Sequence, residues 1–267
     1  MSHPALHTPG TPIERPWPEP ARPWSVMMAW EDLLFLHWRV DAQALAAHIP
    51  PGLELETFDG SAWLAVVPFR MARTRFRWMP KVPTTHAFPE LNVRTYVRAR
   101  SRDGALRPGV WFFSLDAASR LAVEGARLTF GLPYFAARMR CETRDGRVSY
   151  ASERVDRRGP AARFEASWRV AGEHARAVPG TLEHWLVERY CLYAMRRGRI
   201  VCGEVAHKPW EVAPVDLRIE SCEMTRLIGW GGGCEVGCGV GCETRGAPVS
   251  ALAARAVEVA AWSPVAV

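Results

Sequence analysis

Residues 90–97 read Glu-Leu-Asn-Val-Arg-Thr-Tyr-Val and could place four polar groups on one face of a β-strand. Successive side chains of a strand point to opposite faces. One face would then carry the side chains of Glu90, Asn92, Arg94 and Tyr96. Such a row could be an ordinary solvent-exposed face, but apolar and aromatic segments flank it on both sides. A polar row inside an apolar barrel would form the wall of a small-molecule pocket.

Two other residues could contribute to such a pocket. His37 stands among aromatic residues, where a histidine is more often a hydrogen-bonded core residue than an acid or base. Tyr134 follows a Gly-Leu-Pro segment that ends a predicted helix, and a tyrosine there is commonly a packing residue with its hydroxyl tied off. Both residues therefore have a structural and a functional interpretation.

The functional interpretation gives each residue a role. Arg94 would clamp an anion, because the planar guanidinium matches a carboxylate. Glu90 and Tyr134 would be the catalytic pair and would supply acid–base chemistry or hydrogen bonds. The other polar groups would bind and orient the substrate, namely Asn92, His37 and Tyr96. The predicted partner is therefore a small organic ligand that is anionic or carries a carbonyl group.

The composition fits one large domain. The 267 residues are 48% hydrophobic with 12 Trp, which is enough for a sizeable core. Prolines recur through residues 1–23 and predict a disordered lead-in, followed by a single domain at 24–265. No run reaches the roughly 18 apolar residues of a membrane span, and no secretory signal is visible. We expect a cytoplasmic protein with no membrane partner.

The charge of the chain does not predict a nucleic-acid partner. A formal charge of +6 and a pI near 9.2 would permit nucleic-acid binding. The arginines are spread along the whole chain among acidic residues, and no known nucleic-acid-binding motif accompanies them. We therefore expect an arginine-rich solvated surface. The sequence leaves open whether the chain forms a homo-oligomer.

The cysteines are expected to be free thiols, and we predict neither a metal nor a cofactor. Seven cysteines are an odd number for a disulfide framework. Cys234, Cys238 and Cys242 recur every four residues, but the intervening glycines oppose a helix, and Cys222 would be the only nearby fourth ligand. Tight zinc sites usually place two cysteines two to four residues apart, with a distant second pair of ligands. We therefore predict that residues 227–250 form an atypical, mobile loop rich in Gly and Cys.

Turn and capping signals predict an α+β domain with a mostly antiparallel sheet that is strongly curved or closed like a barrel. Three helices are expected, capped by Asp41 over 42–49, by Asp116 over 117–128 and by Thr181 from residue 182. Strands are expected at 27–38, 53–58, 62–71, 90–99, 109–115, 136–142, 147–154, 161–170, 190–195, 200–206 and 212–223. Asp-Gly turns at 59–60 and 145–146 are typical of hairpins.

Several motifs occur in order along the chain: 36–41 (LHWRVD), 49–53 (IPPGL), 58–60 (FDG), 89–97 (PELNVRTYV), 109–116 (GVWFFSLD), 131–134 (GLPY) and 188–193 (ERYCLY). Together they resemble the YqjF-like domain-of-unknown-function family over residues 24–226. That family has no established activity. It is distantly similar to acetoacetate decarboxylases, so the resemblance implies their fold, a curved antiparallel barrel around a small-molecule cavity.

The resemblance does not carry over the decarboxylase mechanism. Residues 126–135 resemble a decarboxylase motif that ends in two lysines, the first of which forms a Schiff base. Tyr134 and Phe135 stand at those two positions, and neither can form an imine. The only lysines of this chain, Lys81 and Lys208, lie in unrelated segments. The resemblance therefore implies a decarboxylase-like cavity without its covalent chemistry.

Three functional interpretations follow. The first is a lysine-independent lyase or hydratase that acts on a small keto acid or related anion. The second is a noncatalytic protein that binds or senses a ligand in the same cavity. The third is purely structural and would make Glu90 and Arg94 a buried ion pair. The sequence does not decide between catalysis and binding.

Overall fold

The computed structural model describes residues 15–80, 84–101, 103–228 and 247–267. Within these ranges it is mainly β-sheet. The helices are α1 (Ala42–Ala46), α2 (Arg120–Phe130), α3 (Leu182–Val187) and the 3₁₀ helix η1 (Met224–Ile228). The strands are β1 (Val26–Glu31), β2 (Leu33–Val40), β3 (Glu54–Leu55), β4 (Ala62–Phe76), β5 (Phe88–Arg100), β6 (Leu106–Ala117), β7 (Tyr134–Arg144), β8 (Arg147–Arg154), β9 (Arg163–Val170), β10 (Ala175–Arg176), β11 (Cys191–Arg196), β12 (Arg199–Ala206), β13 (Glu211–Cys222), β14 (Ser250–Ala254), β15 (Val257–Ala261) and β16 (Val265–Ala266). None of the described helices is long and apolar enough to cross a membrane.

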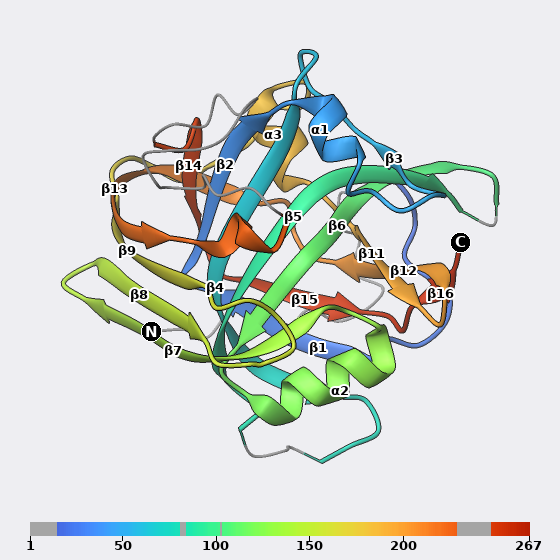
Figure 1. Cartoon of the computed structure of the whole chain (residues 1–267), viewed down its shortest axis with the longest axis horizontal. Helices are drawn as coiled ribbons and strands as arrows, with labels where there is room; N and C mark the ends of the chain where they lie inside the picture. Colours follow the sequence, from blue (N-terminus) through green and yellow to red (C-terminus); the bar gives the residue numbers. More distant parts are fainter. Residues whose placement is uncertain (1–14, 81–83, 102, 229–246) are drawn as a thin grey trace.

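Hydrogen-bonded strand pairs close the sheet into two rings that share β4, β5 and β6 (Figure 1). The first ring runs β1-β15-β12-β11-β6-β5-β4 and returns to β1. The second ring runs β6-β7-β8-β9-β13-β14-β2-β4-β5 and returns to β6. Only β6 with β11 and β6 with β7 pair in parallel among these described strands. The predicted α+β class, with a closed and mostly antiparallel sheet, is confirmed.

Alternation along the shared strands divides the buried side chains between two cores, because both faces of these strands are covered. The first core includes Phe35, Trp63, Ala65, Val67, Phe69, Tyr96, Phe112, Trp210 and Val259. The second core includes Leu34, Leu36, Val66, Leu91, Val93, Val148, Tyr150, Phe164 and Trp168. Burial on both faces explains why the sequence of β4 is nearly continuous in apolar residues.

The strand predicted at 53–58 is reduced to β3, the helix predicted at 42–49 ends at Ala46, and two further elements differ from the prediction. The single strand expected at 27–38 is divided into β1 and β2 by Asp32, which adopts a left-handed backbone with φ of 49°. Helix α2 is capped by Ser119, whose Oγ accepts from the Ala122 amide at 3.2 Å, and not by Asp116. Asp116 lies in β6, because its carboxylate pairs with an arginine on β8 instead. The predicted caps Asp41 and Thr181 are confirmed.

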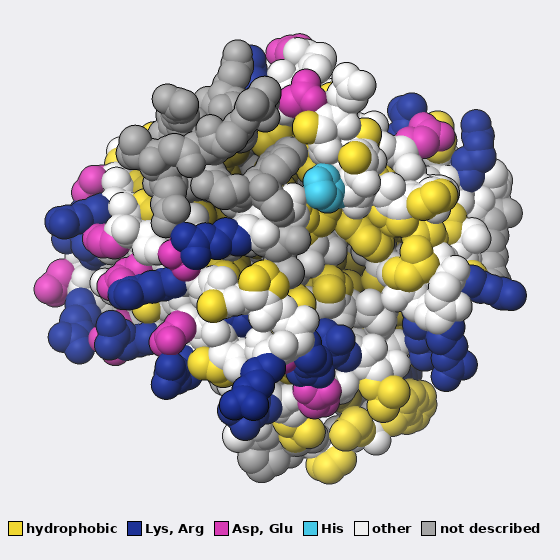
Figure 2. Space-filling model, viewed as in Figure 1, with side chains coloured by type: hydrophobic (Ala, Val, Ile, Leu, Met, Phe, Trp, Pro, Cys, Tyr) yellow, Lys and Arg dark blue, Asp and Glu magenta, His cyan; other side chains and the backbone are white. Residues whose placement is uncertain are grey.

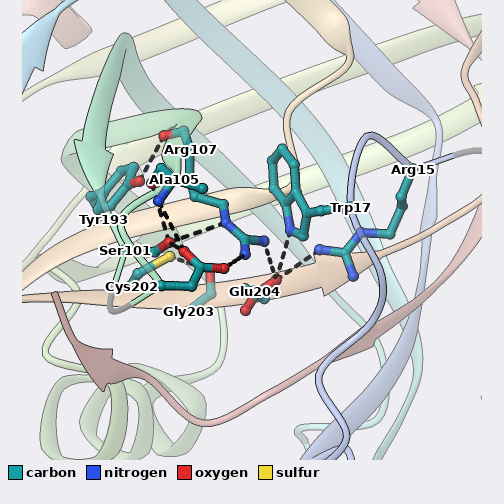
Figure 3. A network of polar contacts seen from close by, with 10 residues as sticks. Arg15, Trp17, Ser101, Ala105, Arg107, Tyr193, Cys202, Gly203 and Glu204 are labelled. Carbon is teal, nitrogen blue, oxygen red and sulfur yellow. Dashed lines mark hydrogen bonds and ion pairs between the residues drawn. The ribbon is translucent and has the colours of Figure 1, made fainter.

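Residues 15–23 contain no helix or strand, but they contact the first ring (Figure 3). The Glu204 carboxylate of β12 accepts hydrogen bonds from Arg15 Nη2 and Trp17 Nε1, each at 2.9 Å. The Arg107 guanidinium carbon lies 4.8 Å from the centre of the Trp17 ring. The disordered lead-in was predicted for 1–23, and residues 1–14 lie outside the described part. The proline content of this segment does not reveal that Arg15 and Trp17 hold it against β12.

The surface supports the interpretation of a solvated, arginine-rich exterior. Figure 2 shows basic side chains interleaved with acidic ones on the face that it presents. Ion pairs such as Arg138 with Glu153 lie at the exposed surface. Cys234, Cys238 and Cys242 fall outside the described residues, as does most of the predicted 227–250 loop. The cysteines of the described part are free thiols.

Candidate functional site

The polar row of β5 faces the first core. In the register of β4 and β5, its members lie opposite first-core residues, with Glu90 opposite Phe69, Asn92 opposite Val67 and Arg94 opposite Ala65. The side chains of Glu90 and Asn92 are buried, with 3% and 5% of each residue exposed. The interpretation as an ordinary solvent-exposed face is therefore wrong for this row.

The apolar residues that alternate with the row face the other way. Leu91 and Val93 are fully buried in the second core. That core is built mainly from residues of β2, β4, β8 and β9. Strands therefore cover this face. A residue of the second core also holds the backbone of the polar row in place, since the Tyr150 hydroxyl of β8 donates to the backbone oxygen of Glu90 at 2.7 Å.

Arg94 has no acidic partner within the described residues. Its Nε and Nη2 atoms are both buried and make no hydrogen bond. These two N–H groups share one edge of the guanidinium, and that edge can bind a carboxylate through two parallel hydrogen bonds. The guanidinium carbon lies 5.4 Å from the centre of the Phe35 ring. Arg94 thus holds a carboxylate-binding edge free inside the molecule.

His37 lies in the same cross-strand row as Arg94. It is opposite Ala65, which is in turn opposite Arg94, so two strand spacings of about 10 Å in total separate their backbones. Both ring nitrogens of His37 are buried without a hydrogen bond. Burial, and then the charge of Arg94, lower the pKa of His37 well below its ordinary value. A neutral imidazole offers one donor and one acceptor.

The remaining predicted binding residues also reach this interior. The Asn92 Oδ1 atom is buried without a hydrogen-bond partner among the described residues. The Tyr96 ring is fully buried, and its centre lies 6.2 Å from that of His37. The structure therefore brings His37, Asn92, Arg94 and Tyr96 together on the first-core side of β2 and β5. Buried polar groups in folded proteins normally have partners, so these unpartnered groups are candidates for contacts with a ligand.

Glu90 and Tyr134 form a second polar group in the same core. The Tyr134 hydroxyl donates to Glu90 Oε2 at 2.9 Å. Burial raises the pKa of Glu90 to about 8, although the hydrogen bond from Tyr134 acts in the opposite direction. Burial and the neighbouring Glu90 raise the pKa of Tyr134 well above its ordinary value. Both groups therefore hold their protons at neutral pH, and a protonated carboxyl in such a place can act as a general acid.

Local structure positions Tyr134 for this contact. Helix α2 ends at Gly131, which takes a left-handed conformation with φ of 71°. The Pro133 oxygen accepts from the Leu115 amide at 3.0 Å, and Arg127 Nη1 donates to the Tyr134 oxygen at 2.7 Å. Strand β7 then starts at Tyr134 and pairs with β6. The Gly-Leu-Pro-Tyr motif therefore delivers the phenol to the interior.

Two buried arginines were not singled out from the sequence. Arg154 Nε donates to both carboxylate oxygens of Asp116, at 2.9 and 3.2 Å, and both side chains are 0% exposed. Arg189 pairs with Glu56 and lies close to Tyr96. Asp116 and Arg189 each fall within a motif shared with the family (109–116 and 188–193), and this was the one sequence signal that could have marked them as important. The expected structural pair of Glu90 with Arg94 does not form, because Glu90 bonds to Tyr134.

The described part of the chain brings no lysine or metal cluster to this site. Lys208 is exposed, and Lys81 lies outside the described residues. No group of three or more His, Cys, Asp and Glu residues in the described ranges is arranged to hold a metal. The Tyr134 phenol is bonded to Glu90. The described side chains of this site offer hydrogen bonds and exchangeable protons.

Comparisons with known proteins identify relatives of this chain. The model of the DUF2071 family, described as an uncharacterized conserved protein, matches residues 27–235. The uncharacterized protein YqjF of Bacillus subtilis (strain 168) is 42% identical over 206 residues, which cover 77% of this chain and 82% of that protein. These matches confirm the resemblance inferred from the ordered motifs.

Solved structures show the same fold. The enduracididine biosynthesis enzyme MppR, in complex with a condensation product of pyruvate and imidazole 4-carboxaldehyde, aligns with a TM-score of 0.59 at 14% identity and covers 92% of this chain and 90% of MppR. Acetoacetate decarboxylase from Legionella pneumophila subsp. pneumophila str. Philadelphia 1 aligns with a TM-score of 0.59 at 12% identity and covers 98% of each chain. The acetoacetate-decarboxylase-like fold expected from the resemblance is confirmed.

Proposed function

The chain belongs to the DUF2071 family of uncharacterized conserved proteins, and we propose that its first core binds a small keto acid or related organic anion. The observation that carries this proposal is Arg94, whose carboxylate-binding edge is buried without an acidic partner in the described residues. An unpaired buried charge is strongly unfavourable, and a bound carboxylate would compensate it. The fold adds support, because MppR, which shares it, has been solved in complex with pyruvate.

The same site has the groups for a lysine-independent lyase or hydratase. Glu90 lies on β5 with Arg94, and Tyr134 reaches Glu90 from the start of β7. Both groups are protonated at neutral pH. In the hydration of an unsaturated monocarboxylate, Glu90 would give its proton to one carbon of the double bond while water adds to the other carbon. The proton released from that water would return to the Glu90 carboxylate. Tyr134 would donate a hydrogen bond to the oxygen on which negative charge develops.

A noncatalytic binding or sensing protein is the second candidate. The observation in its favour is that Glu90 and Tyr134 already satisfy each other at 2.9 Å. A closed pair of this kind can act as a structural hydrogen bond and never exchange a proton with a ligand. In this candidate Arg94, His37 and Asn92 alone would recognise the anion, as binding residues. Both candidates share the anion site and differ only in turnover.

A metabolite screen with two variants separates these candidates. Small keto acids and unsaturated monocarboxylates would be tested by thermal shift, and each hit would be incubated with protein and analysed by NMR for products. We expect the hits to be lost in Arg94→Met. In Glu90→Gln, which preserves shape and hydrogen bonding, we expect binding to remain and turnover to vanish.

The outcomes are distinct. Hits that stabilise Arg94→Met as well as the unmodified protein would show that the anion site lies elsewhere. Hits that bind at Arg94 without any product in the unmodified protein would support the binding or sensing protein over the enzyme. Arg138→Met is the matched control, because Arg138 is an exposed arginine paired with Glu153 and should leave every hit unchanged.

A further inference from the structure

Arg189 is a second arginine of the first core. It follows α3 directly, and its Nε donates to the Trp185 oxygen at 2.8 Å, which satisfies a free carbonyl at the helix end. Its Nη1 pairs with Glu56. The side chain is only 4% exposed, yet its Nη2 atom is buried without a hydrogen-bond partner among the described residues. One donor of Arg189 therefore remains free inside the molecule.

Tyr96 connects this arginine to the site. The Arg189 guanidinium carbon lies 5.0 Å from the centre of the Tyr96 ring and 4.4 Å from that of Trp185. Burial raises the pKa of Tyr96. The positive charges of Arg94 and Arg189, and a polar contact between the Arg94 and Tyr96 side chains, oppose that rise. Burial lowers the pKa of Arg189, and the charge of Arg94 acts in the same direction. Both guanidinium groups therefore lie close to the Tyr96 side chain.

We propose that Arg94 and Arg189 bind one carboxylate together beside Tyr96, which makes the ligand of this site a monocarboxylate. This inference rests on the proposed function, because it requires an anion at Arg94. Arg94 would contribute its Nε and Nη2 edge, and Arg189 would contribute its free Nη2 donor. A carboxylate has about four lone-pair positions and can accept from both arginines.

The charges around the site limit the ligand to one negative charge. Arg94 and Arg189 are positive, and Glu56 neutralises one of them. Glu90, Tyr134 and His37 of the first core are neutral at pH 7. One positive charge then remains uncompensated. A second carboxylate on the ligand would be buried without a cation of its own, which is strongly unfavourable.

Pyruvate binding to a set of variants tests this arrangement, measured by isothermal titration calorimetry at pH 7. The key variant is the double substitution Arg189→Gln with Glu56→Gln, which removes both charges of the pair and keeps the net charge of the site. We expect its affinity to fall by about 10- to 100-fold, because a hydrogen bond to a charged group is lost. Glu56→Gln alone should bind pyruvate more tightly than the unmodified protein.

Ligand charge gives a second readout. The neutral amide pyruvamide should not bind measurably, and the dianion malonate should bind more weakly than pyruvate. Malonate that binds as tightly as pyruvate would overturn the limit of one charge. If the double variant does not fold, Arg189→Lys keeps the charge next to Glu56 but removes the planar fork, and we expect about a tenfold loss of affinity.

Failure of this inference differs from failure of the proposed function. If the double variant, or Arg189→Lys in its place, binds pyruvate as tightly as the unmodified protein while Arg94→Met does not, Arg189 has only a structural role and the inference is wrong. If the unmodified protein and Arg94→Met have the same affinity, or neither binds pyruvate, the anion site itself is wrong.

Discussion

Arg94 and Arg154 have buried guanidinium N–H groups on opposite sides of the strands that the two rings share, and they differ in what surrounds them. Arg154 meets Asp116 in the second core, where both side chains are 0% exposed and the charges cancel. Arg94 faces the first core and has no acidic partner in the described residues. The charge of Arg154 is therefore balanced within the chain, whereas no described residue balances the charge of Arg94.

The largest effect is expected for the buried ion pair of Asp116 and Arg154. Asp116→Ala should lower the free energy of unfolding by about 3–5 kcal/mol, because it leaves Arg154 buried and uncompensated. Urea denaturation followed by circular dichroism would measure this loss. Glu153→Ala, which removes the partner of exposed Arg138, is the control and should cost less than about 1 kcal/mol. A loss below about 1 kcal/mol for Asp116→Ala would remove the contrast between the two cores.

This contrast also shows which parts of the molecule the sequence predicts. The alternation of residues 90–97 predicted correctly that four polar side chains share one face, since a strand leaves no other arrangement. It could not decide between solvent and interior, because that depends on strands distant in sequence that close the first ring over the polar face. Asp116 looked like a helix cap, since nothing local reveals that Arg154, far along the chain, will pair with it.

The next largest effect is expected for the change of stability with pH, which arises from Glu90 in the first core. The pKa of Glu90 rises from 4.5 to about 8 on folding, so the folded protein keeps a proton that the unfolded chain has released. Stability should therefore fall as the pH rises through this window, by as much as about 1.4 kcal/mol per pH unit and about 4 kcal/mol from pH 5 to pH 8.

Urea denaturation at several pH values would compare the unmodified protein with Glu90→Gln, which cannot titrate at this position. His37, with its lowered pKa, adds stability as the pH rises towards 6.5 in both proteins, so the difference between them isolates Glu90. Parallel stability curves for the two proteins would show that Glu90 is ionised in the folded state.

A smaller effect is expected for the hydrogen bond within the first core. Tyr134→Phe should lower stability by about 1 kcal/mol, the usual contribution of one hydrogen bond. It should also raise the pKa of Glu90 further, because the bond from Tyr134 lowers that pKa. NMR of a protein labelled with ¹³C at glutamate carboxyls would follow the titration. A lower pKa of Glu90 in this variant would contradict the assigned direction of the bond.

The smallest change in stability is expected for Arg94 itself. Arg94→Met should alter the free energy of unfolding by less than about 1 kcal/mol or stabilise the ligand-free protein, because it removes a charge that has no partner. Urea denaturation beside Asp116→Ala gives the comparison directly. A loss as large as that of Asp116→Ala would mean that Arg94 is paired within the chain after all.

The central claim is that the first core binds an anion at Arg94, and anomalous diffraction from crystals soaked in sodium bromide tests it most directly. Bromide is a monoanion that can be located without knowing the natural ligand. We predict a bromide ion in contact with Nε and Nη2 of Arg94 and none at Arg154, whose charge Asp116 already cancels. Bromide confined to the outer surface, with Arg94 paired to a carboxylate of the chain itself, would contradict this account.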